Sequence, residues 1–271
     1  GNTMKPTKVF IYSNDTGLSK ATANELINVL SSRKFEISSK YDETVDLIAC
    51  IGGDGTFLNC VHECRLPRAP IIGINTGHLG FFQELVPSEL EMFVNHYNDG
   101  NYTVEKIHPI RALITDRDGI HEITGINEIL VMGMYTKLAH LSIIMDDTPI
   151  QEFIGDGILV STPVGSTAYN YSLGGSLVAP ELDALQLTPM APMNTSAYRC
   201  FRSSILYPAS KNVRLVTRKS TVGDKLLLAY DGLTREFSNV SKIDVMQADD
   251  EIHLIRLPGY DYWNKLTNKL L

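Results

Sequence analysis

The chain has 271 residues, of which 44% are hydrophobic and 20% charged, and its formal net charge is −7. This length supports one large domain or two ordinary ones, and the composition is typical of a soluble globular protein. The acidic balance argues against a nucleic-acid-binding protein, because affinity for a phosphate backbone depends on concentrated basic side chains. It does not argue against a mononucleotide or dinucleotide ligand, since backbone N–H groups can hold phosphates.

The sequence shows no membrane-targeting feature. No apolar run approaches the roughly 20 residues that span a bilayer, and the N-terminus lacks the layout of a signal peptide. Gly1–Thr3 resemble a tag remnant, so we expect the native chain to start at Met4. The four cysteines have no disulfide-framework spacing, and we expect free thiols in a cytoplasmic protein without a membrane or nucleic-acid partner. Cys60, His62 and Cys64 suggest metal ligands, but no second ligand pair follows, so we expect no metal held by the protein.

The first hundred residues alternate strand and helix signals, which predicts a parallel sheet flanked by helices. The third predicted helix starts from a capping box of Ser88 and Glu91, runs through Tyr97 and stops near Gly100. The predicted strands are Lys8–Tyr12, Val45–Ile51 and Pro70–Ile74, and the other predicted helices are Leu18–Ser32 and Thr56–Glu63.

From about Tyr102 the sequence changes to short β-prone runs separated by turn signals such as Asp118-Gly119 and Asp231-Gly232. This pattern predicts an antiparallel sheet domain of two packed layers. Only Thr167–Leu173 and Ala184–Met190 are predicted as helices. The predicted strands are Arg111–Thr115, Ile120–Thr124, Ile126–Met132, Leu141–Met145, Gly157–Ser161, Val213–Val216, Leu226–Tyr230 and Ile252–Leu257.

Together these patterns predict an α+β fold of two domains. Residues 1–101 are expected to form an N-terminal α/β, Rossmann-like domain, and residues 102–257 a C-terminal antiparallel β-sandwich domain. The tail Tyr260–Leu271 is a short amphipathic stretch, so we expect residues 258–271 to fold back on the first domain.

The most informative segment is Gly52–Thr56, which reads Gly-Gly-Asp-Gly-Thr and follows a predicted buried strand. Glycine permits positive φ and leaves no Cβ in the way of a phosphate, and a following helix N-terminus supplies N–H groups. The segment is neither a Walker A loop nor a dinucleotide fingerprint, since GxxxxGK[ST] is absent and Leu58 stands where GxGxxG needs glycine. A second cluster, Gly155–Gly157, leads into the hydroxyl-rich stretch Ser161–Tyr169. Two such turns indicate nucleotide phosphoryl transfer; the alternative is a tight turn with Asp54 as a helix cap.

Gly52-Gly53-Asp54-Gly55-Thr56 resembles the signature shared by NAD kinases, diacylglycerol and sphingosine kinases and, in a related form, 6-phosphofructokinases. The lipid kinases are not expected to carry a Ser-Thr-Pro…Gly-Ser-Thr-Ala-Tyr string, so the later segments favour NAD kinases. Two positions depart from the family pattern: Val164 replaces the usual threonine, and Ile154 stands where several relatives carry a basic residue. The segments that carry the resemblance are Asn75–Phe81, Asn127-Glu128, Gly155–Tyr169 and Asp231-Gly232.

The resemblance implies an NAD kinase. Such an enzyme transfers the γ-phosphate of ATP, or of polyphosphate, to the 2′-hydroxyl of the adenosine ribose of NAD, giving NADP. The implied substrates are NAD and ATP with Mg²⁺ or another divalent cation, and the implied assembly is a homo-oligomer, frequently a homotetramer. A lipid kinase is an alternative, although no apolar or basic membrane-facing patch is evident. A dinucleotide-binding sensor without turnover is another, against which the intact Asp54 and glycine turn argue.

The resemblance also implies roles for individual residues. Asp54 would orient the 2′-hydroxyl and accept its proton. No lysine or arginine is near the turn in the sequence, so the metal and the backbone are expected to carry the phosphate charge. The implied donor-phosphate residues are Gly52, Gly53, Gly55 and Thr56. The implied NAD-binding residues are Asp54, Gly55, Phe81, Asn127, Glu128, Asp156, Thr167, Ala168, Tyr169 and Ser172, with His78, Ser166 and Asp231 as secondary candidates.

Four of these assignments have structural alternatives. Phe81 suits the adenine ring, but Phe81-Phe82 is equally what a core needs. Asn127-Glu128 also fits a polar turn pair, and His78 a solvated loop histidine. Asp231-Gly232 is also a common hairpin turn.

Overall fold

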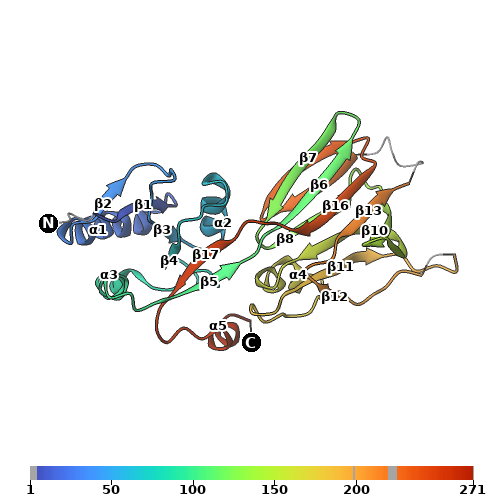
Figure 1. The fold of residues 1–271 in the computed structure, drawn as a ribbon. Helices are drawn as coiled ribbons and strands as arrows, with labels where there is room; N and C mark the ends of the chain where they lie inside the picture. Colours follow the sequence, from blue (N-terminus) through green and yellow to red (C-terminus); the bar gives the residue numbers. More distant parts are fainter. Residues whose placement is uncertain (1–4, 198, 219–224, 271) are drawn as a thin grey trace. The chain divides into compact units, whose positions relative to one another are not determined.

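The computed structural model describes residues 5–197, 199–218 and 225–270 (Figure 1). The start at Met4 and the final Leu271 lie outside the described residues. The chain divides into two compact units. The first comprises the described residues up to Ile107 together with those from Glu251 onward, and the second comprises His108–Asp250. None of the helices in the described ranges is both long and apolar enough to cross a membrane.

The first unit is built on a six-stranded sheet in the order β2-β1-β3-β4-β17-β5, in which only β5 is antiparallel to its neighbour. β3 and β4 are buried along their whole length, as expected for central strands of a covered parallel sheet. The strands are β1 Lys8–Ser13, β2 Glu36–Ser38, β3 Leu47–Gly52, β4 Ile71–Asn75, β5 Thr103–Ile107 and β17 Ile252–Arg256.

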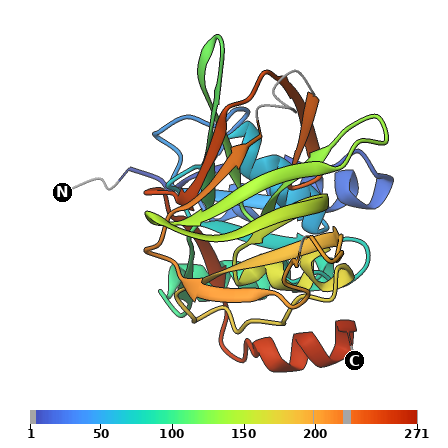
Figure 2. The ribbon, with the colours of Figure 1, turned by 90° about the vertical axis from the view of Figure 1, so that its right-hand side faces the viewer.

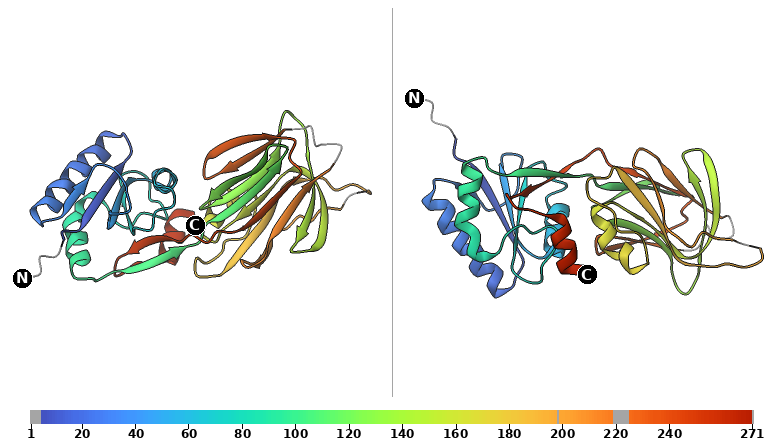
Figure 3. Two further views of the ribbon diagram at one scale, coloured as in Figure 1. Left: turned by 45° about the horizontal axis from the view of Figure 1, so that its top comes forward. Right: turned by 90° about the horizontal axis from the view of Figure 1, so that it is seen from below.

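Helices cover both faces of this sheet (Figure 3). On one face α1 and α3 pack on a core that includes Leu26, Ala49 and Phe93, and α2 and α5 lie on the other face. The predicted α/β architecture is thus confirmed. The helices are α1 Gly17–Ser32, α2 Asp54–Glu63, α3 Leu90–Asn98 and α5 Tyr262–Leu270.

Two expectations for this unit need correction. The expected domain boundaries at residues 101 and 258 lie six or seven residues away in the structure, because β5 and β17 pair with each other inside the first sheet. The capping box of Ser88 and Glu91 is not formed. A 3₁₀ turn, Pro87–Glu89, precedes α3 instead, and the Glu89 carboxylate accepts the Val86 N–H at 2.9 Å.

The second unit is an eleven-stranded antiparallel sheet in which β11 and β12 branch from β10. The main path runs β15-β14-β8-β10-β9-β13-β16-β6-β7. The sheet curls so that β7 comes beside β8 and β14, and its apolar faces enclose one core (Figure 2). The two layers of the expected sandwich are therefore parts of one continuous curled sheet. The strands are β6 Ile110–Asp116, β7 Gly119–Gly125, β8 Glu128–Gly133, β9 Ala139–Met145, β10 Thr148–Ser161, β11 Ala184–Pro192, β12 Ile205–Pro208, β13 Val213–Thr217, β14 Lys225–Tyr230, β15 Leu233–Ser238 and β16 Lys242–Gln247.

Both helices predicted for the second domain differ in the structure. Ala184–Met190 is not a helix but lies in β11, which pairs with β10 and β12. The stretch Thr167–Leu173 contains only the four-residue helix α4, Tyr169–Ser172, which follows a 3₁₀ turn at Val164–Thr167.

Candidate active site

The glycine turn connects the end of β3 to the start of α2. β3 ends at Gly52, Gly53 is the N-cap residue of α2, and Asp54 is the first helical residue. Gly52 has φ +154°, and a Cβ there would lie 2.3 Å from the Thr56 hydroxyl oxygen. Only glycine fits this position, because the Thr56 side chain fills the space. The turn leaves the first N–H groups of α2 without a side-chain cap, as a phosphate-binding helix N-terminus requires.

The Asp54 carboxylate does not cap its own helix. Its two oxygens accept the backbone N–H groups of Phe81 and Phe82, each at 3.1 Å. At Gly80 a Cβ would lie 2.3 Å from Asp54 Oδ1 and 1.9 Å from Gln83 Oε1, so the 80–83 loop wraps closely around the carboxylate. The alternative of a simple helix cap is therefore wrong, and the Asp54 side chain stays 27% exposed.

Cations from the end of the chain surround this loop. Lys269 Nζ lies 3.5 Å from Asp54 Oδ2, and it donates to the Leu79 carbonyl at 3.0 Å. The Phe81 carbonyl accepts Arg256 Nη2 at 2.8 Å and Lys265 Nζ at 3.4 Å. The expectation that no lysine or arginine lies near the glycine turn is therefore wrong, because Lys269 contacts Asp54 in the folded chain. No local pattern could reveal these residues, because β17 and α5 follow the whole second unit in the chain.

The Phe81-Phe82 pair divides between two environments. Phe82 is buried and stacks on Phe57, with ring centroids 4.3 Å apart. Phe81 is half-buried, and its ring lies 6.1 Å from that of Tyr262 and 5.1 Å from Lys269 Nζ. Phe82 is thus the core residue, whereas Phe81 keeps part of its ring accessible. His78, in the preceding loop, is exposed.

In the second unit, Glu128 is the first residue of β8 and Asn127 directly precedes it, within a network of buried polar groups. The Asp231 carboxylate accepts the N–H groups of Ile126 at 2.7 Å and Asn127 at 2.8 Å. The Thr162 hydroxyl donates to the Ile126 carbonyl at 2.6 Å, and a Cβ at Gly165 would lie 1.8 Å from the Asn127 carbonyl oxygen. Thr162, Gly165 and Asp231 therefore fix the backbone that presents Asn127 and Glu128.

Asn127 and Glu128 both have features of a ligand site. Asn127 is 8% exposed, and its buried Oδ1 has no hydrogen-bond partner within the described residues. A buried acceptor of this kind usually has a partner, so the atom is suited to a ligand donor. Glu128 is 7% exposed and accepts the Tyr169 N–H at 3.4 Å. Burial, followed by the nearby charge of Asp231, raises the pKa of Glu128 to about 7.

The remaining predicted residues of the second unit differ in their burial. The Ser166 hydroxyl is buried and accepts the Val178 N–H at 3.0 Å, so it supports the loop from inside. Thr167 and Ala168 are half-buried, and the Thr167 hydroxyl donates to the Val164 carbonyl at 3.3 Å. Tyr169, Ser172 and Asp156 are exposed. Among the predicted residues of this unit, hydrogen bonds connect Tyr169 to Glu128 and Asn127 to Asp231.

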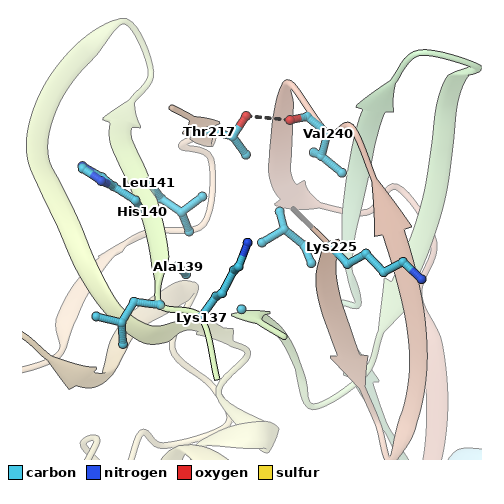
Figure 4. Close-up of a pocket in the computed structure, with 10 residues that line it drawn as sticks. Lys137, Ala139, His140, Leu141, Thr217, Lys225 and Val240 are labelled. Atoms are coloured by element: carbon cyan, nitrogen blue, oxygen red, sulfur yellow. Dashed lines mark hydrogen bonds between the residues drawn. The ribbon is translucent and has the colours of Figure 1, made fainter. Parts of the chain in front are cut away.

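A pocket of the second unit lies at the ends of β8, β9, β13 and β14 (Figure 4). Lys137 points into it, and the Thr217 hydroxyl donates to the Val240 carbonyl at 2.6 Å on its rim. None of the predicted site residues lines this pocket.

In the described ranges no group of three or more His, Cys, Asp or Glu side chains could hold a metal ion together. The four cysteines are buried free thiols, as expected.

The first unit combines a glycine turn at a helix N-terminus with a nearby carboxylate and cations. This arrangement is typical of a nucleotide-dependent phosphotransferase. Comparison with known families makes the assignment specific. The ATP-NAD kinase N-terminal domain matches residues 12–102, and the ATP-NAD kinase C-terminal domain matches residues 126–257. The chain belongs to the NAD kinase family, and it is a phosphotransferase.

Individual relatives agree with this assignment. The NAD kinase of Finegoldia magna is 37% identical over 264 residues, which cover 96% of this chain and 97% of that protein. The NAD kinase of Streptococcus pyogenes is 31% identical over 274 residues, covering 99% and 96%. Yeast NADH kinase complexed with NADH has a TM-score of 0.84 at 22% identity, over 98% of this chain and 87% of that one. An Archaeoglobus fulgidus NAD kinase in complex with ATP has a TM-score of 0.76 at 21% identity, over 97% of each chain.

Proposed function

We propose that this enzyme transfers the γ-phosphate of MgATP to the 2′-hydroxyl of the adenosine ribose of NAD, and that Asp54 is the base. The observation that carries the proposal is the position of the Asp54 carboxylate. Asp54 is the first residue of α2 and lies within the glycine turn, and its carboxylate accepts two backbone N–H groups. A carboxylate fixed in this way can orient a hydroxyl and accept its proton.

The donor phosphates would lie at the glycine turn. The N–H groups of Gly52, Gly53 and Gly55 and the N-terminus of α2 favour negative charge, and the Thr56 hydroxyl lies beside Gly52. Mg²⁺ enters in this proposal as part of the MgATP substrate, where it neutralises phosphate charge. Polyphosphate is the competing donor, and a donor-preference assay distinguishes the two.

NAD would be held by the Asn127–Glu128 cluster. The unpaired Asn127 Oδ1 can accept a hydrogen bond from the adenine edge, and the Glu128 carboxylate can accept from a ribose diol. Phe81, Thr167, Ala168, Tyr169 and Ser172 keep part of their surface accessible and would add ring, backbone and hydroxyl contacts. Asp156 is an exposed side chain of β10 and would contact the nicotinamide end or the ligand of a neighbouring subunit.

A cytoplasmic location and a homotetrameric assembly complete the proposal, and membership of the NAD kinase family supports both. Sedimentation of the purified enzyme tests the assembly. A monomer with full activity would contradict the tetramer.

The function is tested by a coupled assay for NADP formed from NAD and MgATP, with Asp54→Asn as the key variant. We expect Asp54→Asn to lower kcat by about 10²- to 10⁴-fold and to keep NAD binding, because the amide cannot accept the proton. The exposed Glu91→Gln in α3 is the matched control and should behave like wild type. Measurable NAD binding without any NADP from the wild-type enzyme would indicate a dinucleotide-binding sensor. Near-full turnover by Asp54→Asn would refute the base role alone.

A further inference from the structure

The C-terminal helix α5 presents one continuous face to the loop of residues 79–83, whose backbone N–H groups bind the Asp54 carboxylate. Tyr262, Lys265, Leu266 and Lys269 follow the i, i+3, i+4, i+7 spacing of one helix face. Tyr262 and Leu266 are the buried residues of the helix, and the two lysines reach the loop backbone. This face therefore combines apolar anchoring with positive charge.

Arg256 and Lys265 fasten this part of the chain to the loop. Lys265 Nζ donates to the carbonyls of Phe81 and Gln83, and burial lowers the pKa of Lys265 to about 8. Arg256 is 4% exposed; it donates to the Phe81 carbonyl and pairs with Glu105 at 3.5 Å. The Lys265 ammonium holds α5 to the loop carbonyls, and Arg256 holds the end of β17 to the same loop and to Glu105.

Lys269 differs from these two cations. Its side chain is 32% exposed, and its ammonium lies 3.5 Å from the Asp54 carboxylate that the proposed reaction uses. An ammonium has three donors, and within the described residues contacts to the Leu79 carbonyl and to Asp54 account for two of them. Lys269 therefore combines contact with the reacting carboxylate, access to solvent and one more donor.

We propose that Lys269 is a further substrate-binding residue of the phosphoryl-transfer site, and that its ammonium binds the phosphoryl group as it is transferred. This inference rests on the proposed function of Asp54. In the step, the 2′-hydroxyl oxygen forms a bond to the γ-phosphorus. The bond from that phosphorus to its bridging oxygen breaks, and ADP keeps the electron pair.

The hydroxyl proton goes to Asp54, which becomes neutral. The Lys269 ammonium contacts the γ-phosphate of bound MgATP with its remaining donor. Once Asp54 is neutral, no carboxylate charge competes, and the donation to the phosphoryl oxygens strengthens. Lys269 thus balances the charge of Asp54 before transfer and that of the phosphoryl group during transfer.

The test compares Lys269→Met, which removes the charge, with Lys269→Arg, which keeps it. Asn264→Ala, an exposed position of the same helix, is the matched control. Three quantities are measured on the full-length enzyme: kcat, KM for NAD, and the calorimetric Kd for MgATP. We expect Lys269→Met to weaken MgATP binding about 10-fold, because a donor to the γ-phosphate is lost, and to lower kcat about 100-fold, because charge develops at that donor during transfer. KM for NAD should stay within about twofold of wild type, and Lys269→Arg should recover most of both losses.

The outcomes separate this inference from the proposed function. Equal kcat and equal MgATP affinity in Lys269→Met and wild type would overturn it. Equal impairment of Lys269→Met and Lys269→Arg, together with a lower melting temperature, would also overturn it, because the residue would then only dock the helix. A wild-type enzyme that makes no NADP would refute the proposed function, and the MgATP affinities would still decide the phosphate contact of Lys269.

Discussion

Glu128 is the residue whose ionisation should be visible in the stability of the fold. Its pKa is raised to about 7, first by burial and then by the charge of Asp231, whereas an unfolded glutamate titrates near 4.5. Between these two values the folded state holds one more proton than the unfolded state, so Glu128 lowers the stability as pH rises from about 4.5 through 7. Glu128→Gln removes this effect. We expect its free energy of unfolding to exceed that of wild type by more at pH 8 than at pH 5, by up to about 3 kcal/mol.

Denaturant unfolding of both proteins at several pH values measures this difference. Thr234→Val, at an exposed position of β15 that carries no titratable group, is the control and should show a difference that does not change with pH. A pH-independent difference for Glu128→Gln would contradict the raised pKa.

The local sequence predicted where the glycine turn lies, but not the contacts that distant segments make with the predicted residues. The turn at Gly52–Thr56 lies between a strand and a helix as predicted. Ser166 belongs to the same motif as Thr167, yet its buried hydroxyl accepts the Val178 N–H. The motif does not predict this contact. Lys269 contacts Asp54 only because the tail of the chain returns to the first unit. The motifs predicted the family, whereas the contacts of Ser166 and Lys269 depend on the tertiary fold.

At the scale of elements, the clearest error concerns β11. Ala184–Met190 contains Ala, Leu, Gln and Met, which favour helices, but intrinsic propensity is a weak prior that tertiary context overrides. Leu185 and Leu187 alternate into the apolar core, whereas Gln186 and Thr188 on the other side are buried against polar groups. Because both sides of the strand are buried, the segment lacks the simple alternation of apolar and exposed polar residues.

The polar side of β11 holds the segment after α4, which leads to a prediction. The Thr188 hydroxyl donates to Asn170 Oδ1 at 2.6 Å, and Asn170 Nδ2 donates to the Ser166 and Ser176 carbonyls. Thr188→Val keeps the shape but leaves the buried Asn170 oxygen unpaired. We expect it to lower the free energy of unfolding by about 1–3 kcal/mol. Urea midpoints measure the loss, and the exposed Thr234→Val in β15 should stay within about 0.5 kcal/mol of wild type.

At the scale of the whole molecule, strand–helix alternation predicted the first architecture and successive β-prone runs predicted the second. Neither pattern predicted the path of the chain between them. The run Ile252–Leu257 reads like the β-strands before it, and the sequence assigned it to the second domain. In the structure β17 enters the first sheet between β4 and β5. A largely buried strand such as β17 has no sequence feature that identifies its sheet, so this pairing could not be predicted from local pattern.

The position of β17 gives the last prediction. A chain that ends at Asp250 keeps every strand of the second unit but lacks β17, whose Ile255 lies in the core of the first unit. β5 would lose its sheet partner, and one edge of β4 would lose its neighbour. We expect hydrogen exchange to remain slow within residues 108–250 and to become fast in the described residues up to 107, because only the first unit loses a central strand. A chain that ends at Gly259 retains β17 but lacks α5, and it should keep slow exchange in both units while losing the contacts of Lys265 and Lys269. Slow exchange throughout the first unit in the chain that ends at Asp250 would show that β17 is not needed for the folding of that unit.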